Sequence, residues 1–168
     1  DALPISFTGH SVSVSAVAIT PNGKQVISAS PDKTLKLWDL ATGEELLTFT
    51  GHSLSVNAVV VTPNGKQLIS ASYDKTLKLW DLAVGEELLT FTGHSLSVSA
   101  VAVTPNGKQL ISASGDKTLK LWDLITREEL LTFSGHNDWV SAVAVTANGK
   151  HLISASWEIG RASCRERV

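Results

Sequence analysis

The sequence contains little cysteine, little net charge and no long hydrophobic run. Its single cysteine, Cys164, excludes a framework of disulfides within the chain. A net charge of −2 gives no sign of a polyanionic partner, so no nucleic-acid partner is expected. No apolar run approaches the roughly 18–20 residues that a membrane-spanning helix needs, and no segment has the pattern of a signal peptide. With 43% hydrophobic residues, the composition predicts a globular cytoplasmic protein without a membrane partner.

What the chain has in abundance is a repeat of 42 residues, written almost four times. Each copy has Gly-His near its start, and three copies have Trp-Asp near their end. The histidines are His10, His52, His94 and His136, and the tryptophans are Trp38, Trp80 and Trp122. Residues 51–92 and 93–134 differ at only seven positions. A repeat of this length is one supersecondary unit that cannot bury its own apolar face, so the copies must stack to form a core.

The pattern within one copy predicts four antiparallel β-strands. In residues 51–92, the segment 55–61 is apolar at nearly every position, as in a strand that is buried on both faces. The segment Thr62–Gly65 then predicts a hairpin turn, because proline presets φ at the second position and glycine accepts a positive φ. No helical period is present. The strands are expected at residues 55–61, 68–72, 76–81 and 87–91.

The Gly-His and Trp-Asp pairs, the Ser-x-Asp-Lys-Thr turn and the length of the copies resemble the WD40 β-propeller family. The resemblance covers Phe7 to Trp157. It implies an all-β fold in which each copy forms one four-stranded antiparallel sheet, called a blade. It also implies an open arc of about three and a half blades from a larger propeller. The near-identity of the copies resembles propellers that serve as C-terminal sensor or scaffold modules in large prokaryotic proteins.

The two ends of the chain depart from the repeat. Asp1–Ile5 can be encoded by GACGCTCTTCCGATC, whose reverse complement lies within a DNA sequence that encodes Glu158–Val168. Both ends are therefore interpreted as one sequencing adapter, translated in opposite orientations. The expected divisions are adapter-derived ends at 1–5 and 158–168, full repeats at 6–50, 51–92 and 93–134, and a truncated fourth repeat at 135–157.

The resemblance implies that a hydrogen-bonded tetrad of His, Ser, Asp and Trp braces each blade. Such a set satisfies groups that are costly to bury alone, because the imidazole bridges the carboxylate and the indole N–H finds an acceptor. The implied tetrads are His10, Ser28, Asp32 and Trp38, then His52, Ser70, Asp74 and Trp80, then His94, Ser112, Asp116 and Trp122. Blade four keeps His136 and Ser154, but Glu158 holds the Asp position and the Trp strand is missing.

The same residues raise two chemical alternatives. Ser70, His52 and Asp74 could form the triad of a hydrolase, with Ser70 as the nucleophile. The set recurs in every complete copy, however, and no Gly-x-Ser-x-Gly elbow is present. A structural brace is therefore favoured, and no enzyme activity is expected. The evenly spaced histidines would lie in different blades, too far apart to converge on one zinc ion, so neither a metal nor a cofactor is expected.

The informative positions are those at which the copies disagree. One such position lies directly before the tetrad Asp or its equivalent. Another lies three residues after each repeat histidine, where Trp139 replaces the serine of the other copies. By resemblance, these positions surround the central channel on the top face, where partners usually dock, and Trp and Tyr are frequent binding hot spots. Contact with a protein or peptide is predicted for Tyr73, Trp139, Trp157, Asn57, Pro31 and Gly115. Ordinary packing of the tryptophans against the next blade is the alternative.

The chain is accordingly predicted to be a rigid, non-catalytic docking platform. One alternative is a regulatory or sensor propeller attached to a kinase or NTPase domain outside these residues, and another is a purely structural array. The repeated lysines, such as Lys66, Lys75 and Lys78, are interpreted as solvated blade rims. A nucleic-acid surface would need net positive charge, whereas residues 51–92 have three lysines against four acidic residues.

Two further departures from the repeat concern turns. Arg127 replaces Gly43 and Gly85, so the outer turn of blade three is expected to differ if those glycines need a positive φ. Ala147 replaces a proline that the other three copies share, which is expected to loosen the first hairpin of blade four slightly.

Overall fold

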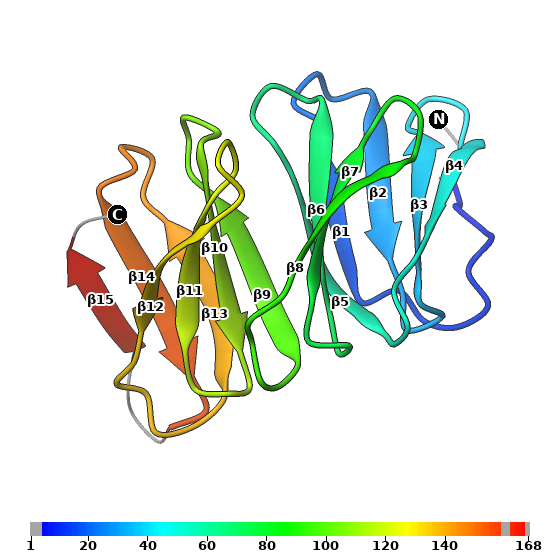
Figure 1. Cartoon of the computed structure of the whole chain (residues 1–168). Coiled ribbons are helices and arrows are strands. Elements are labelled where there is room, and N and C mark those ends of the chain that lie inside the picture. Colours follow the sequence, from blue (N-terminus) through cyan, green and yellow to red (C-terminus); the bar gives the residue numbers. More distant parts are fainter. Residues whose placement is uncertain (1–4, 159–161, 167–168) are drawn as a thin grey trace.

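The computed structural model describes residues 5–158 and the backbone of residues 162–166 (Figure 1). Blade one consists of β1 (Ala16–Ile19), β2 (Gln25–Ala29), β3 (Thr34–Asp39) and β4 (Glu45–Thr50). Blade two consists of β5 (Val56–Val61), β6 (Gln67–Ser72), β7 (Leu77–Asp81) and β8 (Glu87–Phe91). Blade three consists of β9 (Val98–Val103), β10 (Gln109–Ser114), β11 (Leu119–Asp123) and β12 (Glu129–Phe133), and blade four of β13 (Val140–Val145), β14 (His151–Ser156) and β15 (Ala162–Glu166).

Each blade is an antiparallel sheet whose strands pair in sequence order. The first strands β1, β5, β9 and β13 lie next to one another and join the sheets, so the four blades form an open arc with blades one and four at its ends (Figure 1). The all-β fold with four-stranded antiparallel blades, predicted from the repeat, is confirmed.

The hydrophobic core lies between consecutive blades rather than within any one of them. At the junction of blades two and three, Ile69 and Phe91 pack with Val98, Leu110 and Trp122, all of them buried. The rings of Phe91 and Trp122 have centroids 5.5 Å apart. Because both faces of an interior blade are covered in this way, each repeat depends on its neighbours for burial of its apolar surface.

The fourth sheet differs from the expected half blade, because β15 occupies the place of a third strand. Its backbone pairs with β14 in a register that sets Arg165 opposite Leu152. In blades two and three, the corresponding leucines Leu68 and Leu110 face Trp80 and Trp122. An unpaired strand edge accepts an extended segment through its backbone groups, and this pairing does not require the tryptophan.

Most of the expected adapter-derived ends lie outside the described residues. Of 1–5 only Ile5 is described, and of 158–168 only Glu158 and the backbone of 162–166 are. The interpretation of both ends as adapter sequence stays a prediction.

The outer turn of blade three does not differ from the others, contrary to expectation. Gly43 and Gly85 adopt φ values of 77° and 80°, and Arg127 adopts 69°. The closing hydrogen bond is also the same, since Arg127 N donates to Asp123 O at 2.9 Å and Gly85 N donates to Asp81 O at 3.0 Å. The turn therefore keeps its shape, and the arginine accepts a left-handed conformation that costs about 1–2 kcal/mol for a residue with a Cβ atom.

The first hairpin of blade four likewise keeps its geometry without the proline. Gly149 N donates to Thr146 O at 2.8 Å, the same distance as between Gly65 N and Thr62 O in blade two. Gly149 also shares the positive φ of 69° with Gly65. Any loosening by Ala147 therefore concerns the freedom of the unfolded chain rather than the folded turn.

Candidate functional site

A chain of hydrogen bonds crosses the interior of blade two. Trp80 Nε1 donates to Ser70 Oγ at 2.8 Å. Ser70 Oγ lies 2.7 Å from His52 Nε2, and His52 Nδ1 lies 2.8 Å from Asp74 Oδ2. Because the carboxylate can only accept, the imidazole carries a proton on Nδ1, and the serine hydroxyl can then donate to Nε2 of the neutral ring. Each buried polar group of the set has a partner.

The same chain recurs in blades one and three. Its three distances are 2.8, 2.7 and 2.8 Å in blade one, and 2.9, 2.7 and 2.8 Å in blade three, in the order Trp–Ser, Ser–His and His–Asp. The residues brought together are those that the resemblance implied, namely His10, Ser28, Asp32 and Trp38, and His94, Ser112, Asp116 and Trp122. Recurrence with constant geometry indicates a brace that belongs to the blade.

The tetrad aspartates also close the loop that holds them. Asp74 accepts the backbone N–H of Ser53 at 3.0 Å, and the backbone N–H and hydroxyl of Thr76 at 3.0 and 2.6 Å. Burial raises the pKa of Asp74, but the hydrogen bonds from His52, Thr76 and Ser53 outweigh burial and hold this pKa well below its usual range. The pKa values of Asp32 and Asp116 are lowered by the same balance of burial and hydrogen bonds.

The tetrad has the connectivity of a hydrolytic triad but lacks an accessible nucleophile. Ser70 is fully buried, and its oxygen already binds both Trp80 and His52. A serine nucleophile must reach a substrate carbonyl next to an oxyanion hole, and a hydroxyl enclosed between an indole and an imidazole cannot do so. This geometry suits a brace and not catalysis.

Blade four keeps part of the brace. His136 Nε2 lies 2.8 Å from Ser154 Oγ. Glu158 accepts a hydrogen bond from the backbone N–H of Asn137, the contact that Asp74 makes with Ser53 in blade two. The longer glutamate thus takes over the aspartate's bond to the loop.

Three aromatic side chains meet on the face formed by the loops before the first strands and between the second and third strands. Trp139 and Trp157 are stacked, with ring centroids 5.4 Å apart and planes at 19°. Tyr73 meets Trp139 edge-on at 6.2 Å. Tyr73 is 47% exposed, Trp157 is 67% exposed, and Trp139 is half-buried. We call this set, Tyr73, Trp139 and Trp157, the aromatic platform.

The platform extends over three consecutive blades. It can cross blade three because the residue beneath it there is a glycine, which has no side chain. A Cβ atom on Gly115 would lie 3.2 Å from the Trp139 ring, so the indole rests directly on the backbone of blade three. Hydrogen bonds fix the loops below, since Tyr73 N donates to Ser55 O at 2.9 Å and Trp157 N donates to Trp139 O at 3.0 Å. The rings are therefore held on fixed backbone.

Two of the residues predicted to contact a partner have other surroundings. Gly115 is buried under Trp139, so a partner does not reach it. Asn57 Nδ2 donates to Val98 O of the next blade at 2.8 Å, and Ser15 makes the equivalent bond to Val56 O. The Asn57 amide thus links blades two and three, and its contact with a partner stays a prediction. Pro31 lies half-buried on blade one.

A set of ion pairs on the outer strands was not anticipated from the sequence. Lys78 Nζ lies 2.8 Å from Glu87 Oε2 and 2.7 Å from Thr90 Oγ1, and the pairs Lys36–Glu45 and Lys120–Glu129 repeat the arrangement. The constant spacing of Lys and Glu in every full copy could have revealed it. These three lysines are engaged within their own blades, which leaves them poorly suited to phosphate contacts.

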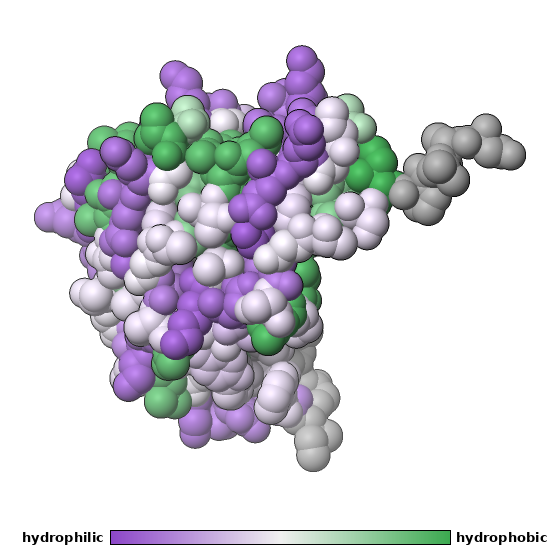
Figure 2. All heavy atoms as spheres, turned by 90° about the vertical axis from the view of Figure 1, so that its right-hand side faces the viewer, coloured by the Kyte–Doolittle hydropathy of each residue, from purple (hydrophilic) through white to green (hydrophobic). Residues whose placement is uncertain are grey.

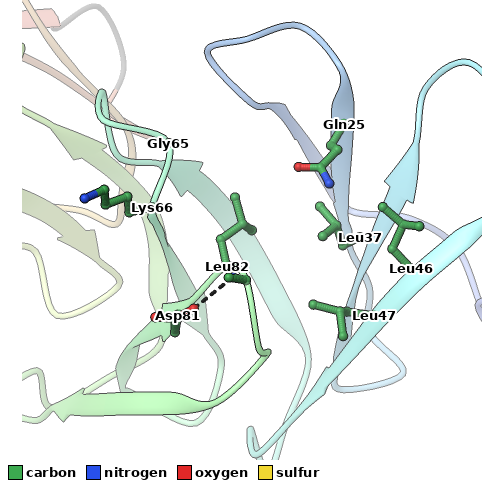
Figure 3. A pocket seen from close by; sticks show the side chains of 9 residues that line it. Gln25, Leu37, Leu46, Leu47, Gly65, Lys66, Asp81 and Leu82 are labelled. Carbon is green, nitrogen blue, oxygen red and sulfur yellow. Dashed lines mark hydrogen bonds between the residues drawn. The ribbon is translucent and has the colours of Figure 1, made fainter.

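A groove of about 620 Å³ runs between blades one and two (Figure 3). Leucines form much of its lining, together with the polar residues Gln25, Lys66 and Asp81. Every lining residue of blade one has an identical or similar counterpart in blade two, such as Gln67 for Gln25 and Leu79 for Leu37. The side chains that blade one contributes to the groove are accordingly part of the repeat, and none of them is specific to this junction. The leucines that line it are Leu37, Leu46 and Leu47 of blade one and Leu82 of blade two.

The described part of the chain contains no helix that could span a membrane. Within that part, no group of three or more His, Cys, Asp or Glu residues is arranged to hold a metal ion.

Comparisons with known proteins agree with the geometry of the blades. A family model described as "WD domain, G-beta repeat" matches residues 3–39, 43–81, 85–123 and 127–158. In a solved structure of U3-55K, the matching region has a TM-score of 0.89 and 27% sequence identity, and it covers 95% of this chain and 50% of that chain.

Curated relatives match over about one repeat each. The small ribosomal subunit protein RACK1 of Saccharomyces cerevisiae is 56% identical over 39 residues, which is 23% of this chain and 12% of the relative. The nuclear distribution protein PAC1 of Candida tropicalis is 54% identical over 35 residues, which is 21% of this chain and 7% of the relative. The ribosome biogenesis protein BOP1 homolog of Drosophila grimshawi is 40% identical over 42 residues, which is 25% of this chain and 5% of the relative. The matches thus span at most 12% of these three relatives.

Proposed function

The chain belongs to the WD40 repeat family, and we propose that it is a non-catalytic scaffold that docks a protein or peptide on the aromatic platform. The observation that supports this most is the placement of Tyr73, Trp139 and Trp157 together on the loops, with Trp157 67% exposed. Exposed, clustered tryptophans are costly to leave in water, and they are the residues that contribute most to protein interfaces.

Rigidity supports the same function. The tetrads and the hydrogen-bonded loops hold the platform before any partner arrives, so little conformational entropy is lost on binding. Because the indoles of Trp139 and Trp157 are stacked on each other, a partner would cover the outer face of Trp157 and the edge of Tyr73. A flat or apolar side chain in an extended peptide fits such a surface.

Selection from a random peptide library on the immobilised chain tests this function. We expect binders whose affinity falls at least tenfold in Trp157→Ala, because truncating a hot-spot tryptophan costs about 2 kcal/mol or more. Val84→Ala is the matched control, since Val84 is also exposed but lies on the loop between β7 and β8. Binders that respond equally to both variants, or to neither, would contradict docking on the platform.

A regulatory or sensor role, in which the propeller is attached to a kinase or NTPase domain, is the alternative function; it is supported only by the near-identity of the copies. We also propose that the partner binds on the top face and that the chain is cytoplasmic. Two relatives have ribosomal names, but the engaged lysines and the net charge of −2 favour a protein partner over RNA for this chain.

A further inference from the structure

Three lysines have a backbone conformation that is unfavourable for their residue type. Lys33, Lys75 and Lys117 directly follow the tetrad aspartates, in the turns between the second and third strands, and their φ values are 74°, 73° and 71°. The turns close in the same way, for example through the Lys75 N–H, which donates to Ser72 O at 3.3 Å. The left-handed region crowds a Cβ atom against the backbone, whereas glycine adopts it freely.

The other left-handed turns of the repeat are formed mainly by glycine. At the first hairpin turn all four copies have a glycine, each with a φ of 69°, and at the outer turn two of the three full copies have one. The turn after the tetrad aspartate instead keeps lysine in every full copy, although the residue two positions earlier changes from Pro31 to Tyr73 to Gly115. A strained position that keeps one side chain beside a variable neighbour indicates that the side chain itself is used.

The ammonium groups of these lysines have no partner within the part of the chain that the structure describes. All three residues are exposed, and none takes part in an ion pair. Lys78, in the same blade as Lys75, lies by contrast 2.8 Å from Glu87. The carboxylate of Asp74 is already occupied, because each of its oxygens accepts two hydrogen bonds and its side chain is only 8% exposed. The face that carries the platform is the lower side in Figure 1, where β2 and β14 end, and Figure 2 shows hydrophilic side chains along the same edge.

Two of the lysines lie next to the aromatic pair at the centre of the platform. Lys75 is two residues from Tyr73, and two residues span at most about 7 Å of chain. Lys117 is two residues from Gly115, on whose backbone the Trp139 ring rests. The rings of Tyr73 and Trp139 have centroids 6.2 Å apart. An apolar surface thus lies beside two positive charges, on loops of blades two, three and four.

We propose that the platform binds an acidic peptide segment, in which an apolar side chain covers Tyr73 and Trp139 while neighbouring carboxylates reach the lysines. This inference rests on the proposed docking function and adds the charge of the partner to it. Opposite charges around an apolar contact speed association and fix the register of the partner. Three lysines, with the exposed carboxylate of Asp138 beside Trp139, suit a few carboxylates in one place better than a nucleic acid with a phosphate on every residue.

Fluorescence anisotropy on the full chain tests the charge of the partner. The probe is a labelled peptide with a central phenylalanine flanked by glutamates, and its control has glutamines at the same positions. We expect the glutamate peptide to bind about tenfold more tightly, and this ratio to shrink as the salt concentration rises. Equal affinity of the two peptides would overturn the proposal.

Charge reversals locate the contact. Lys75→Glu combined with Lys117→Glu should weaken binding of the glutamate peptide by about tenfold or more. Lys66→Glu combined with Lys108→Glu changes the net charge equally, but these exposed lysines lie in the turns between the first and second strands, at the opposite ends of the blades. The affinity should therefore stay nearly unchanged in this control. An equal loss in both double variants would show an effect of net charge alone and would contradict a contact with these lysines.

Substitution of one lysine by two small residues separates the role of its side chain from the stability of the turn. Lys75→Gly should melt at a higher temperature than Lys75→Ala, because glycine relieves the strain at a φ of 73°. Both variants should bind the glutamate peptide more weakly than the wild type, since both lack the ammonium group. Wild-type affinity in the two variants would rule out the contact with Lys75.

Two further outcomes distinguish the charge of the partner from docking itself. If peptides selected on the chain lose affinity in Tyr73→Ala but not in the lysine variants, the platform docks a partner without regard to charge, and only the acidic assignment fails. If they respond to neither, docking on the platform fails as well. A labelled oligouridylate that binds more tightly than the glutamate peptide, and loses affinity in the Lys75 and Lys117 variants, would replace the acidic peptide by RNA.

Discussion

At the scale of single residues, the tetrad is a device for burying polar groups without leaving any of them unpaired. The described residues include no buried side-chain nitrogen or oxygen that lacks a hydrogen-bond partner. Serine lies at the centre of each tetrad because its one hydroxyl both accepts a hydrogen bond from the indole and donates one to the imidazole. Loss of the serine therefore affects two partners at once.

Ser70→Ala should lower the free energy of unfolding by about 1–3 kcal/mol, because it leaves the Trp80 N–H and the His52 ring without their partner. Urea denaturation followed by tryptophan fluorescence measures the change. Ser53→Ala removes an exposed hydroxyl from the same blade and should have almost no effect. Equal effects of the two substitutions would contradict the role of the brace.

The lowered pKa of Asp74 sets the direction of a pH effect. Its pKa is lower in the folded chain than the unfolded value of about 3.9, so its stabilising effect is full above about pH 5 and declines as pH falls through the unfolded value toward the folded one. Asp74→Asn should destabilise at pH 7, and the difference from the wild type should shrink between pH 5 and pH 3. A difference that stays constant over this range would contradict the prediction. Glu44→Gln, an exposed position, is the control.

At the scale of secondary-structure elements, the repeat makes the strands predictable, but it does not reveal where one copy departs from the others. The strand expected at 87–91 is Glu87–Phe91, and the one expected at 55–61 is Val56–Val61. Alternation and turn residues act locally, so the sequence alone suffices for these bounds. The conformation of Arg127 could not be predicted from the sequence. The pairing of the flanking strands β11 and β12 fixes the turn and overrides the preference of arginine for a negative φ. The bond from Asn57 to blade three also escaped, since it depends on a neighbour that is 41 residues away.

The turn at Arg127 places a residue that has a Cβ atom in the left-handed region. Arg127→Gly should be more stable than Arg127→Ala by about 1 kcal/mol, because both remove the side chain but only glycine relieves the strain at φ 69°. Thermal denaturation of the two variants side by side gives the difference. If alanine proves equal or better, the positive φ of this turn is not a source of strain.

At the scale of the whole molecule, stacking of blades explains both the core and the surfaces that remain. Apolar side chains that are buried at each inner junction are exposed at the two ends of the arc, as Val17 and Ile153 show. The need for stacking could be predicted from the length of the repeat alone. The third strand of blade four could not, because β15 comes from a segment outside the repeat pattern. The stacking of Trp139 on Trp157 could not be predicted either, because variation between the copies does not distinguish a tryptophan that packs against its neighbours from one that contacts a partner.

The five tryptophans fall into two kinds, which their indole N–H groups distinguish directly. Those of Trp38, Trp80 and Trp122 donate to buried serines, whereas those of Trp139 and Trp157 have no partner among the described residues. Hydrogen exchange of the indole protons, followed by NMR on chain labelled with ¹⁵N-tryptophan, is the most direct measurement. We predict three slowly exchanging signals and two that exchange rapidly, assigned by single Trp→Phe variants. Five signals of similar protection, or slow exchange of the Trp157 proton, would contradict a braced scaffold that presents an exposed aromatic platform.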